Sequence, residues 1–407
     1  MSIVLLVFFV VYLGMMLGHL PWLKVDRASI ALGGAIALLA TAELTQTQAL
    51  ASIDFSTIGM LFGLMLISIQ FQMSGLYGVL SSAVGRVQAS PVILLALLTG
   101  LVGILSAFLT NDVVAVAMTP VVLSISLRRG LNPVPFLLAI AFAANAGSVA
   151  TIIGSPQNML IGETLQLSFA GFMGYAAVPA ALSLIVVWLA LGFYYRGRWW
   201  LARPGSAAVG EESVELTLDR LETVKGLLVL GLILYAFIFT QWSRGLVAAS
   251  AGAFMLFNAR FLSRDMLDRV DWGLLILFVG LFIVNGAIQD TGMPQHLVGD
   301  LKAAGFDLQD SGVLYVVSAV LSDLTSNVPT VMLLLPYAAD HQAGPLMALA
   351  SGLSSNLIII GSLANIIVVD AANRAGLSIS FGEFAKVGVP VALISLLIAW
   401  GWVRYVM

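Results

Sequence analysis

The chain has 407 residues, of which 60% are hydrophobic and 10% charged, and its formal net charge is −3. A soluble domain carries about 25% charged residues, and the mean hydropathy of this chain is +1.03. Together with repeated apolar runs of about 17–20 residues, this composition indicates an all-α polytopic membrane protein. The absence of cysteine excludes disulfides, thiolate metal sites and cysteine nucleophiles.

The apolar runs predict the elements in chain order. Because the first run lacks a basic segment and a cleavage site, we expect a membrane span there and not a signal peptide. The first half, residues 1–195, is predicted to hold spans near 2–19, 28–44, 56–75 and 172–195, a hairpin near 91–127, and a long broken helix near 134–168. A polar cytoplasmic linker follows at 196–222. The second half, residues 223–407, is predicted to hold spans near 223–241, 244–262, 272–289 and 386–405, a hairpin near 312–339, and a long broken helix near 345–372.

The two halves also match in sequence. Residues 154–158 (GSPQN) correspond to residues 361–365 (GSLAN), and Asp54 corresponds to Asp271. The two hairpins correspond as well, because each has an Asn followed by a Pro at the same spacing. Three matches in the same order predict an internal duplication.

The second hairpin indicates how the repeats are oriented. A break at 326–329 leaves arms of roughly 12–14 residues, too short for the ~20 residues that a crossing needs. The hairpin is therefore predicted to be re-entrant. Each repeat then has five transmembrane helices plus one re-entrant hairpin, and the odd number inverts the second repeat. Inverted repeats with broken helices at the midplane are typical of secondary transporters.

The distribution of basic residues predicts the topology. With the N-terminus outside, 15 of the 18 lysines and arginines lie in predicted cytoplasmic loops, and the opposite orientation would reverse this ratio. We therefore expect an integral protein of the inner (cell) membrane with both termini outside. The first hairpin would enter from the cytoplasm and the second from outside.

Polar residues at the two hairpin tips and the two interruptions predict a transport site. Broken helices free backbone groups and create helix ends with partial charges, which membranes tolerate only where they line a cavity. For any single residue, an ordinary contact between helices is the alternative. The predicted substrate- or ion-binding residues are Thr110, Asn111, Asp112, Gly154, Ser155, Gln157, Asn158, Ser326, Asn327, Gly361, Ser362 and Asn365.

Asp112 is the first candidate for a coupling residue. It follows the tip residue Asn111, where a carboxylate would either cap a helix or bind a coupling proton or cation. Burial disfavours the charged form of a carboxyl group and so favours proton exchange. The second copy has Val328 at this position, which predicts a single site. Asp323, four residues before the second tip, is a further proton-coupling candidate.

Other acidic residues are expected to be structural. Asp54 and Asp271 begin their spans and are predicted to be N-terminal caps. Asp370 and Arg374 are predicted to form an exposed helical pair.

The sequence indicates no enzyme and no cofactor. A GxxxxGK[ST] nucleotide site is absent, and the three histidines lack the spacing of metal ligands. A catalytic triad is absent as well, which disfavours a membrane enzyme. An ion gradient is therefore the expected source of energy, and no nucleic-acid partner is expected.

Nearly the whole chain resembles the ion transporter superfamily, which includes divalent-anion/sodium symporters, arsenite permeases, NhaD-type sodium/proton antiporters and plant silicon efflux transporters. The tips Thr110-Asn111-Asp112 and Ser326-Asn327-Val328 and the interruption 154–158 are similar to the superfamily's motifs. FLTNDVVAVAMTPVVL is most similar to the arsenite-permease and silicon-efflux branch. The resemblance implies a scaffold that dimerises, giving a homodimer, and a transport domain that moves as an elevator.

The leading expectation is proton-coupled efflux of a small neutral oxyacid, such as arsenous, antimonous or silicic acid. The dicarboxylate symporters of the superfamily carry Thr where this chain has Asp112 and Val328. A carboxylate beside an anionic solute would repel it, and no Arg or Lys lies in either tip or interruption. A sodium-coupled transporter of inorganic or carboxylic anions and a sodium/proton antiporter are the alternatives. The expected partners are therefore a small inorganic solute, a coupling proton or sodium ion, and the lipid bilayer.

Overall fold

The computed structural model describes residues 3–18, 25–201, 217–258, 260–338 and 340–406. Within these ranges the chain is almost entirely helical, and one isolated bridge joins Leu131 to Trp200. Seven of the described helices are long and apolar enough to cross a membrane, and shorter apolar helices accompany them. The structure therefore confirms the all-α polytopic class.

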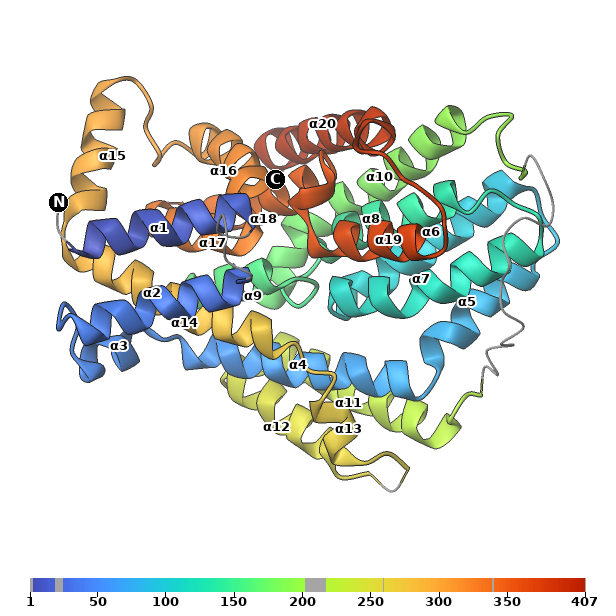
Figure 1. The fold of residues 1–407 in the computed structure, drawn as a ribbon, viewed down its shortest axis with the longest axis horizontal. Coiled ribbons are helices and arrows are strands. Elements are labelled where there is room, and N and C mark those ends of the chain that lie inside the picture. The colour runs from blue at the N-terminus through green and yellow to red at the C-terminus, as the bar shows by residue number, and fades with distance from the viewer. Residues whose placement is uncertain (1–2, 19–24, 202–216, 259, 339, 407) are drawn as a thin grey trace.

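The helices follow the same order in the two halves (Figure 1). The first half contains α1 (Ile3–Leu17), α2 (Arg27–Ala40), α3 (Gln46–Ser52), α4 (Phe55–Met73), α5 (Leu76–Arg86), α6 (Pro91–Phe108), α7 (Asn111–Arg128), α8 (Val134–Ser148), α9 (Pro156–Thr164) and α10 (Phe169–Tyr194). The second half contains α11 (Arg220–Phe239), α12 (Arg244–Leu256), α13 (Ser263–Leu267), α14 (Trp272–Asp290), α15 (Met293–Ala303), α16 (Ser311–Thr325), α17 (Asn327–Leu334), η1 (Leu335–Tyr337), α18 (Ala343–Ser354), η2 (Ile359–Gly361), α19 (Leu363–Arg374) and α20 (Phe381–Tyr405).

Four of these helices, α3, α5, α13 and α15, are absent from the predicted elements. They are short and mix polar with apolar residues, so they give no apolar run. Helix α7 contains Pro120 in its interior and continues to Arg128. Membrane helices tolerate an internal proline because neighbouring groups bond to the freed backbone. Most of the predicted linker, residues 202–216, lies outside the described residues.

Two helix pairs join the halves through small residues. In the pair α4–α12, a Cβ built at Gly63 would lie 2.0 Å from the carbonyl oxygen of Ala248. In the pair α2–α14, a Cβ at Gly280 would lie 2.6 Å from the carbonyl carbon of Ala31. Gly280 lies 217 positions after Gly63, and Ala248 lies 217 positions after Ala31, so the two contacts correspond to each other under the offset of the predicted duplication. Glycine and alanine permit this approach, which is how membrane helices commonly pack.

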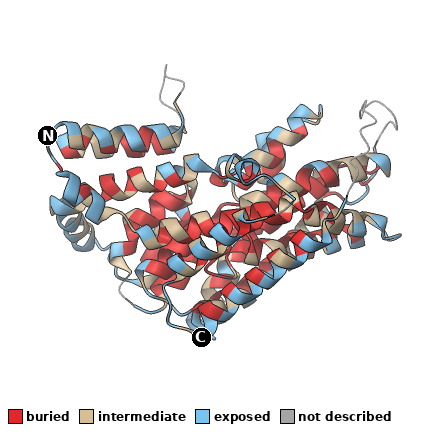
Figure 2. Cartoon of the chain, turned by 90° about the horizontal axis from the view of Figure 1, so that it is seen from below, coloured by how far each residue is buried: buried red, intermediate tan, exposed pale blue. Residues whose placement is uncertain are grey.

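The helices form two groups, which we name after their proposed roles. The scaffold helices are α1–α4 and α11–α14, and the transport helices are α6–α10 and α16–α20. Most of the scaffold lies in the lower part of Figure 1, and most of the transport helices lie above it. In Figure 2 the buried residues gather in the interior, and α18 is buried along its whole length. Outer helices such as α11 expose apolar side chains, as expected for a surface in contact with lipid.

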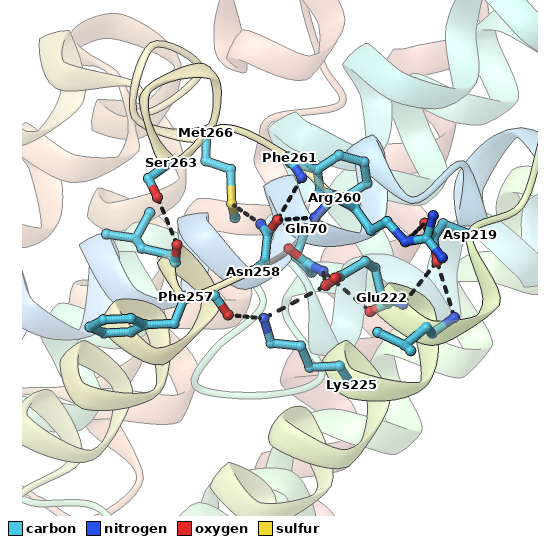
Figure 3. A network of polar contacts seen from close by, with 12 residues as sticks. Gln70, Asp219, Glu222, Lys225, Phe257, Asn258, Arg260, Phe261, Ser263 and Met266 are labelled. Carbon is cyan, nitrogen blue, oxygen red and sulfur yellow. Dashed lines mark hydrogen bonds and ion pairs between the residues drawn. The ribbon is translucent and has the colours of Figure 1, made fainter.

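One end of the scaffold contains a buried carboxylate with several partners (Figure 3). Glu222 in α11 is 1% exposed and accepts a hydrogen bond from Nε2 of Gln70 in α4 at 2.6 Å. Nζ of Lys225 lies 3.6 Å from the same carboxylate and donates to the carbonyl oxygen of Phe257 at 2.7 Å. The network therefore ties α4, α11 and the end of α12 together.

Candidate functional site

Hydrogen bonds anchor the tips of both hairpins. In the second hairpin, only Ser326 separates α16 from α17, and its φ of +78° is in the left-handed region that serine rarely adopts. Next to it, Nδ2 of Asn327 lies 2.9 Å from Oγ of Ser355. In the first hairpin, the backbone nitrogen and Oγ1 of Thr110 each lie 3.3 Å from Oγ of Ser68 in α4. The backbone nitrogen of Asn111 also donates to the carbonyl oxygen of Gly154 at 3.3 Å, and the hydroxyl of Tyr12 in α1 donates to that of Pro329 at 3.2 Å. Both hairpins therefore contact the scaffold as well as the broken helix of their own half.

Two asparagines support the interruptions of the broken helices. Asn158 donates from Nδ2 to the carbonyl oxygens ten and seven residues earlier, at 3.1 and 2.9 Å. Asn365 donates to the carbonyls at the same two spacings, at 2.7 and 3.2 Å. Both side chains are buried. They satisfy carbonyls that the helix breaks leave free, which a membrane protein must do.

A group of buried amides joins the two broken helices. Nδ2 of Asn145 in α8 donates to Oδ1 of Asn356 at 2.9 Å and to Oδ1 of Asn365 at 3.0 Å. Oγ of Ser362 donates to Oδ1 of Asn145 at 2.8 Å. The prediction omitted Asn145 and Asn356. An isolated asparagine inside an apolar helix is the sequence signal that marks Asn145.

A cavity of about 460 Å³ lies between the hairpin tips, the broken helices and the scaffold. Half of the predicted binding residues line it, namely Asn111, Asp112, Gln157, Ser326, Asn327 and Ser362. Apolar side chains from α1, α14 and α19 complete the walls, and exposed Asp26 and Asp271 also line the cavity. Asp26 and Asp271 cap α2 and α14, and Asp54 caps α4, so the predicted capping roles of Asp54 and Asp271 are confirmed.

Thr110 lines a smaller cavity of about 50 Å³ that it shares with Asp112. Arg269 and Asp271, from the start of α14, line the same cavity. Asp112 therefore borders both cavities. The other charged residues that line the two cavities come from the scaffold.

The other predicted residues lie behind the cavity wall. A Cβ at Gly154 would lie 2.2 Å from a backbone oxygen, and a Cβ at Gly361 would lie 2.7 Å from Oδ1 of Asp323. These glycines permit close packing at the two interruptions. The hydroxyl of Ser155 and both carboxyl oxygens of Asp323 are buried and have no hydrogen-bond partner among the described residues. With Asn158 and Asn365, these residues shape the site without lining the main cavity.

Positive charge lies closer to the site than the sequence indicated. The tips and interruptions carry no Arg or Lys, but Arg27 lines the main cavity and Arg269 the smaller one. Both arginines belong to loops or helix starts far from the motifs in sequence. Only the packing of α2 against α14, and of α14 against α17, brings them to the site, so no local pattern could reveal them.

The cavity offers hydroxyl and amide groups together with one carboxyl at a hairpin tip. Oδ1 of Asn111 is buried and has no hydrogen-bond partner among the described residues, so it can accept a bond from a solute. Within the described ranges, no group of three or more His, Asp or Glu side chains could hold a metal ion. The arrangement suits a small solute that donates and accepts hydrogen bonds.

Comparisons with known proteins agree with this architecture. An uncharacterised transporter of Mycobacterium tuberculosis is 30% identical over 381 residues, which cover 87% of each chain. The inner membrane protein YbiR of Escherichia coli is 33% identical, covering 79% of this chain and 81% of its own. The silicon efflux transporter LSI3 of Oryza sativa subsp. japonica is 26% identical, covering 92% and 91%.

Among solved structures, the Alcanivorax borkumensis YdaH transporter matches with a TM-score of 0.60. The match covers 98% of this chain and 96% of that chain, at 16% identity, and so shows a common fold. Residues 4–353 match the sequence profile of the citrate transporter family, CitMHS. The predicted resemblance to the ion transporter superfamily is thereby confirmed, and the protein belongs to the citrate transporter (CitMHS) family of multi-pass membrane transporters.

Proposed function

We propose that the protein is a secondary transporter that exports a small neutral oxyacid, of the silicic, arsenous or antimonous acid type, in exchange for protons. Asp112 carries this proposal. It lines the cavity at the first hairpin tip, and no hydrogen bond or ion pair holds its carboxyl among the described residues. A free carboxyl on a solute cavity can take up a proton from one side and release it on the other.

The other groups on the cavity support a neutral solute. Asn111, Gln157, Asn327 and Ser362 offer amides and hydroxyls, which can replace the water around a hydroxylated acid. The similarity to a silicon efflux transporter over 92% of this chain supports the same solute class.

The test is transport by purified protein in sodium-free liposomes that are preloaded with silicic acid, arsenite or antimonite. An acidic outer medium should drive efflux of at least one of these acids. Asp112→Asn should abolish gradient-driven efflux but retain exchange of solute at equal pH. Asp370→Asn, at an exposed ion pair, is the matched control. Efflux that requires sodium, or that is unchanged in Asp112→Asn, would contradict the proposal.

A second candidate is sodium-coupled transport of a carboxylic or inorganic anion. The guanidinium of Arg27 on the cavity favours it, because an anion needs a positive partner there. The family name, citrate transporter, points the same way. In this case sodium should raise the melting temperature by mass action, and citrate should add to the shift only when sodium is present. No shift over a broad sodium titration would exclude this candidate.

We place the chain in the inner membrane with both termini outside, as two inverted repeats in a homodimer whose transport helices move as an elevator. The repeated contacts between α4 and α12 and between α2 and α14 support the duplication. The cavity, bordered by both groups of helices, supports relative movement of the two. Asp26 and Asp271 lie at the end that this topology assigns to the cytoplasm, so the state described is the inward-open one.

A further inference from the structure

Two arginines occupy equivalent positions in the two halves. Arg27 is the first residue of α2, and Arg244 is the first residue of α12, 217 positions later. The same offset relates the caps of α4 and α14 and the closest contacts of α2 and α12. In both helices the preceding residue accepts a hydrogen bond from the backbone nitrogen three residues on. The two side chains therefore start from matching positions.

Arg244 is docked on a transport helix. Its Nη1 donates to the carbonyl oxygen of Gly162 at 3.2 Å, and its Nη2 donates to that of Leu167. Gly162 lies in the last turn of α9, where the helix dipole favours a cation, and Leu167 lies in the loop that follows. Beside them, Oγ of Ser56 in α4 donates to Oε1 of the buried Glu163 at 2.9 Å. At this end, the scaffold and the broken helix are fastened together.

Among the described residues, Arg27 donates to no backbone carbonyl. It lines the open cavity, and its buried Nε has no hydrogen-bond partner among the described residues. Gly273, the equivalent of Ser56, lines the same cavity. Asp370, the equivalent of Glu163, pairs within its own helix, with Arg374 at 2.7 Å, and not with α14. At this end, the scaffold and α19 stand apart.

We propose that Arg244 and Arg27 are alternating latches. Arg244 on the C-terminal end of α9 holds one end closed in the state described. Arg27 docks on the C-terminal end of α19 when the cavity closes at its present mouth and opens at the other end. A buried guanidinium without a partner costs free energy, so the docked arginine stabilises each state in turn. The inference rests on the alternating access that the proposed function requires, but not on the identity of the solute or the coupling ion.

The absence of cysteine allows a direct test, because one introduced cysteine is then the only thiol. Ile366 in α19 lines the cavity, and Met159 in α9 is the equivalent residue and is fully buried. We would compare Ile366→Cys and Met159→Cys for labelling by a water-soluble maleimide in solute-free protein. The ratio of the two labelling rates reports which end is open.

Arg244→Gln should slow labelling of the Ile366→Cys thiol and speed labelling of the Met159→Cys thiol, with the rate ratio changing about tenfold. Arg27→Gln should change the ratio in the opposite direction. Arg244→Lys, which keeps one charged donor, should give an intermediate ratio. Arg264→Gln, at an exposed position, is the matched control and should leave the ratio unchanged.

The latch proposal would be overturned if the ratio of the two labelling rates stayed within about twofold of the control in both Gln variants. It would also be overturned if the ratio changed in the same direction in both. Melting temperatures measured alongside identify a variant that has lost its fold, in which case Arg244→Lys and the corresponding Arg27→Lys decide. Because the labelling needs neither solute nor gradient, a failed transport assay leaves this result intact. Equally, unchanged labelling leaves the proposed solute and coupling ion untouched.

Discussion

The side-chain amide of Asn145 in α8 donates to the side-chain oxygen of Asn365 in α19 at 3.0 Å, across 220 residues of sequence. Asn145 is 2% exposed, and its oxygen accepts from Ser362 at 2.8 Å. Asn365 in turn donates to two carbonyls of its own helix break. One buried side chain thus joins the broken helices of the two halves next to the cavity.

Asn145→Ala should destabilise the protein strongly. It leaves the side-chain oxygens of Asn356 and Asn365 without this donor and the hydroxyl of Ser362 without its acceptor. An unsatisfied buried polar group costs about 1–3 kcal/mol, so we expect a loss of about 3 kcal/mol in total. Thermal melting of the purified protein measures the effect. Asn373→Ala, at an exposed residue of α19, serves as the control, and an equal shift in both variants would contradict the role of Asn145.

The hairpin tips and the interruptions could be predicted because their signals are local. A polar residue inside an apolar run, such as Asn111 or Asn327, must line a cavity or pair with another group at membrane depth. The duplication predicted from the sequence reinforced these signals. The prediction that Asp370 and Arg374 form a surface pair is confirmed for the same reason, since one helical turn decides it.

The remaining features depend on tertiary packing. Arg27 and Asp271 reach the cavity only because α2 and α14 pack against each other and beside the transport helices. Asn158 and Asn365 carry the motif signal, yet their amides are committed to the backbone. A motif therefore locates a break in a helix, but it does not distinguish a residue that binds solute from one that supports the break. The amphipathic pattern of a short helix such as α5 covers too few residues to be recognised in the sequence.

Lys225→Met should cost about 3 kcal/mol of stability, because it leaves the buried carboxylate of Glu222 without a cation. This value is the lower end of the range for removing one partner of a buried ion pair, because the side chain of Lys225 is still 16% exposed. The double variant Glu222→Gln/Lys225→Met should recover most of the loss, since the neutral amide needs no cation. Chemical or thermal unfolding of the four proteins gives the coupling energy.

The matched control for Lys225→Met is Arg264→Met, which breaks an exposed pair with Asp268 at 4.0 Å. Exposed pairs contribute about 0–1 kcal/mol, so this variant should be close to the unsubstituted protein. If Lys225→Met and Arg264→Met melt alike, Glu222 draws its stability from Gln70 and not from Lys225.

Asp26 predicts a dependence of stability on pH. The hydrogen bonds from Ser29 hold the pKa of Asp26 below its ordinary value of 3.8. A lowered carboxyl pKa stabilises the fold above the unfolded pKa, and this stabilisation disappears as pH falls through the folded value. Asp26→Asn keeps a capping side chain but cannot ionise, so its melting temperature should fall less steeply between about pH 5 and pH 3.

Asp26→Ala removes the cap itself and should cost about 1 kcal/mol at neutral pH. The Asn and Ala variants together separate the charge of Asp26 from its hydrogen bond. Identical pH profiles for the unsubstituted protein and Asp26→Asn would show that the carboxylate adds nothing beyond the cap.

Asp323 and Asp112 should behave differently when each is replaced by Asn. Asp112 lines the cavity, whereas both oxygens of Asp323 are buried without a hydrogen-bond partner among the described residues. Burying an unpaired carboxylate costs free energy. We therefore expect Asp323→Asn to keep proton-driven efflux and to melt at the same or a higher temperature. Asp112→Asn should lose proton-driven efflux.

The packing of Asp323 against Gly361 supplies an independent check of this assignment. A Cβ at Gly361 would lie 2.7 Å from Oδ1 of Asp323, so Gly361→Ala requires the carboxyl to move and should lower the melting temperature. Adding Asp323→Ala should restore part of that loss, because it removes the carboxyl group that the new methyl group would meet.

If Asp323→Asn instead loses proton-driven efflux while solute exchange persists, the coupling proton binds at Asp323. Asp112 would then serve the solute alone, because a residue that only fills space behind Gly361 could not alter coupling.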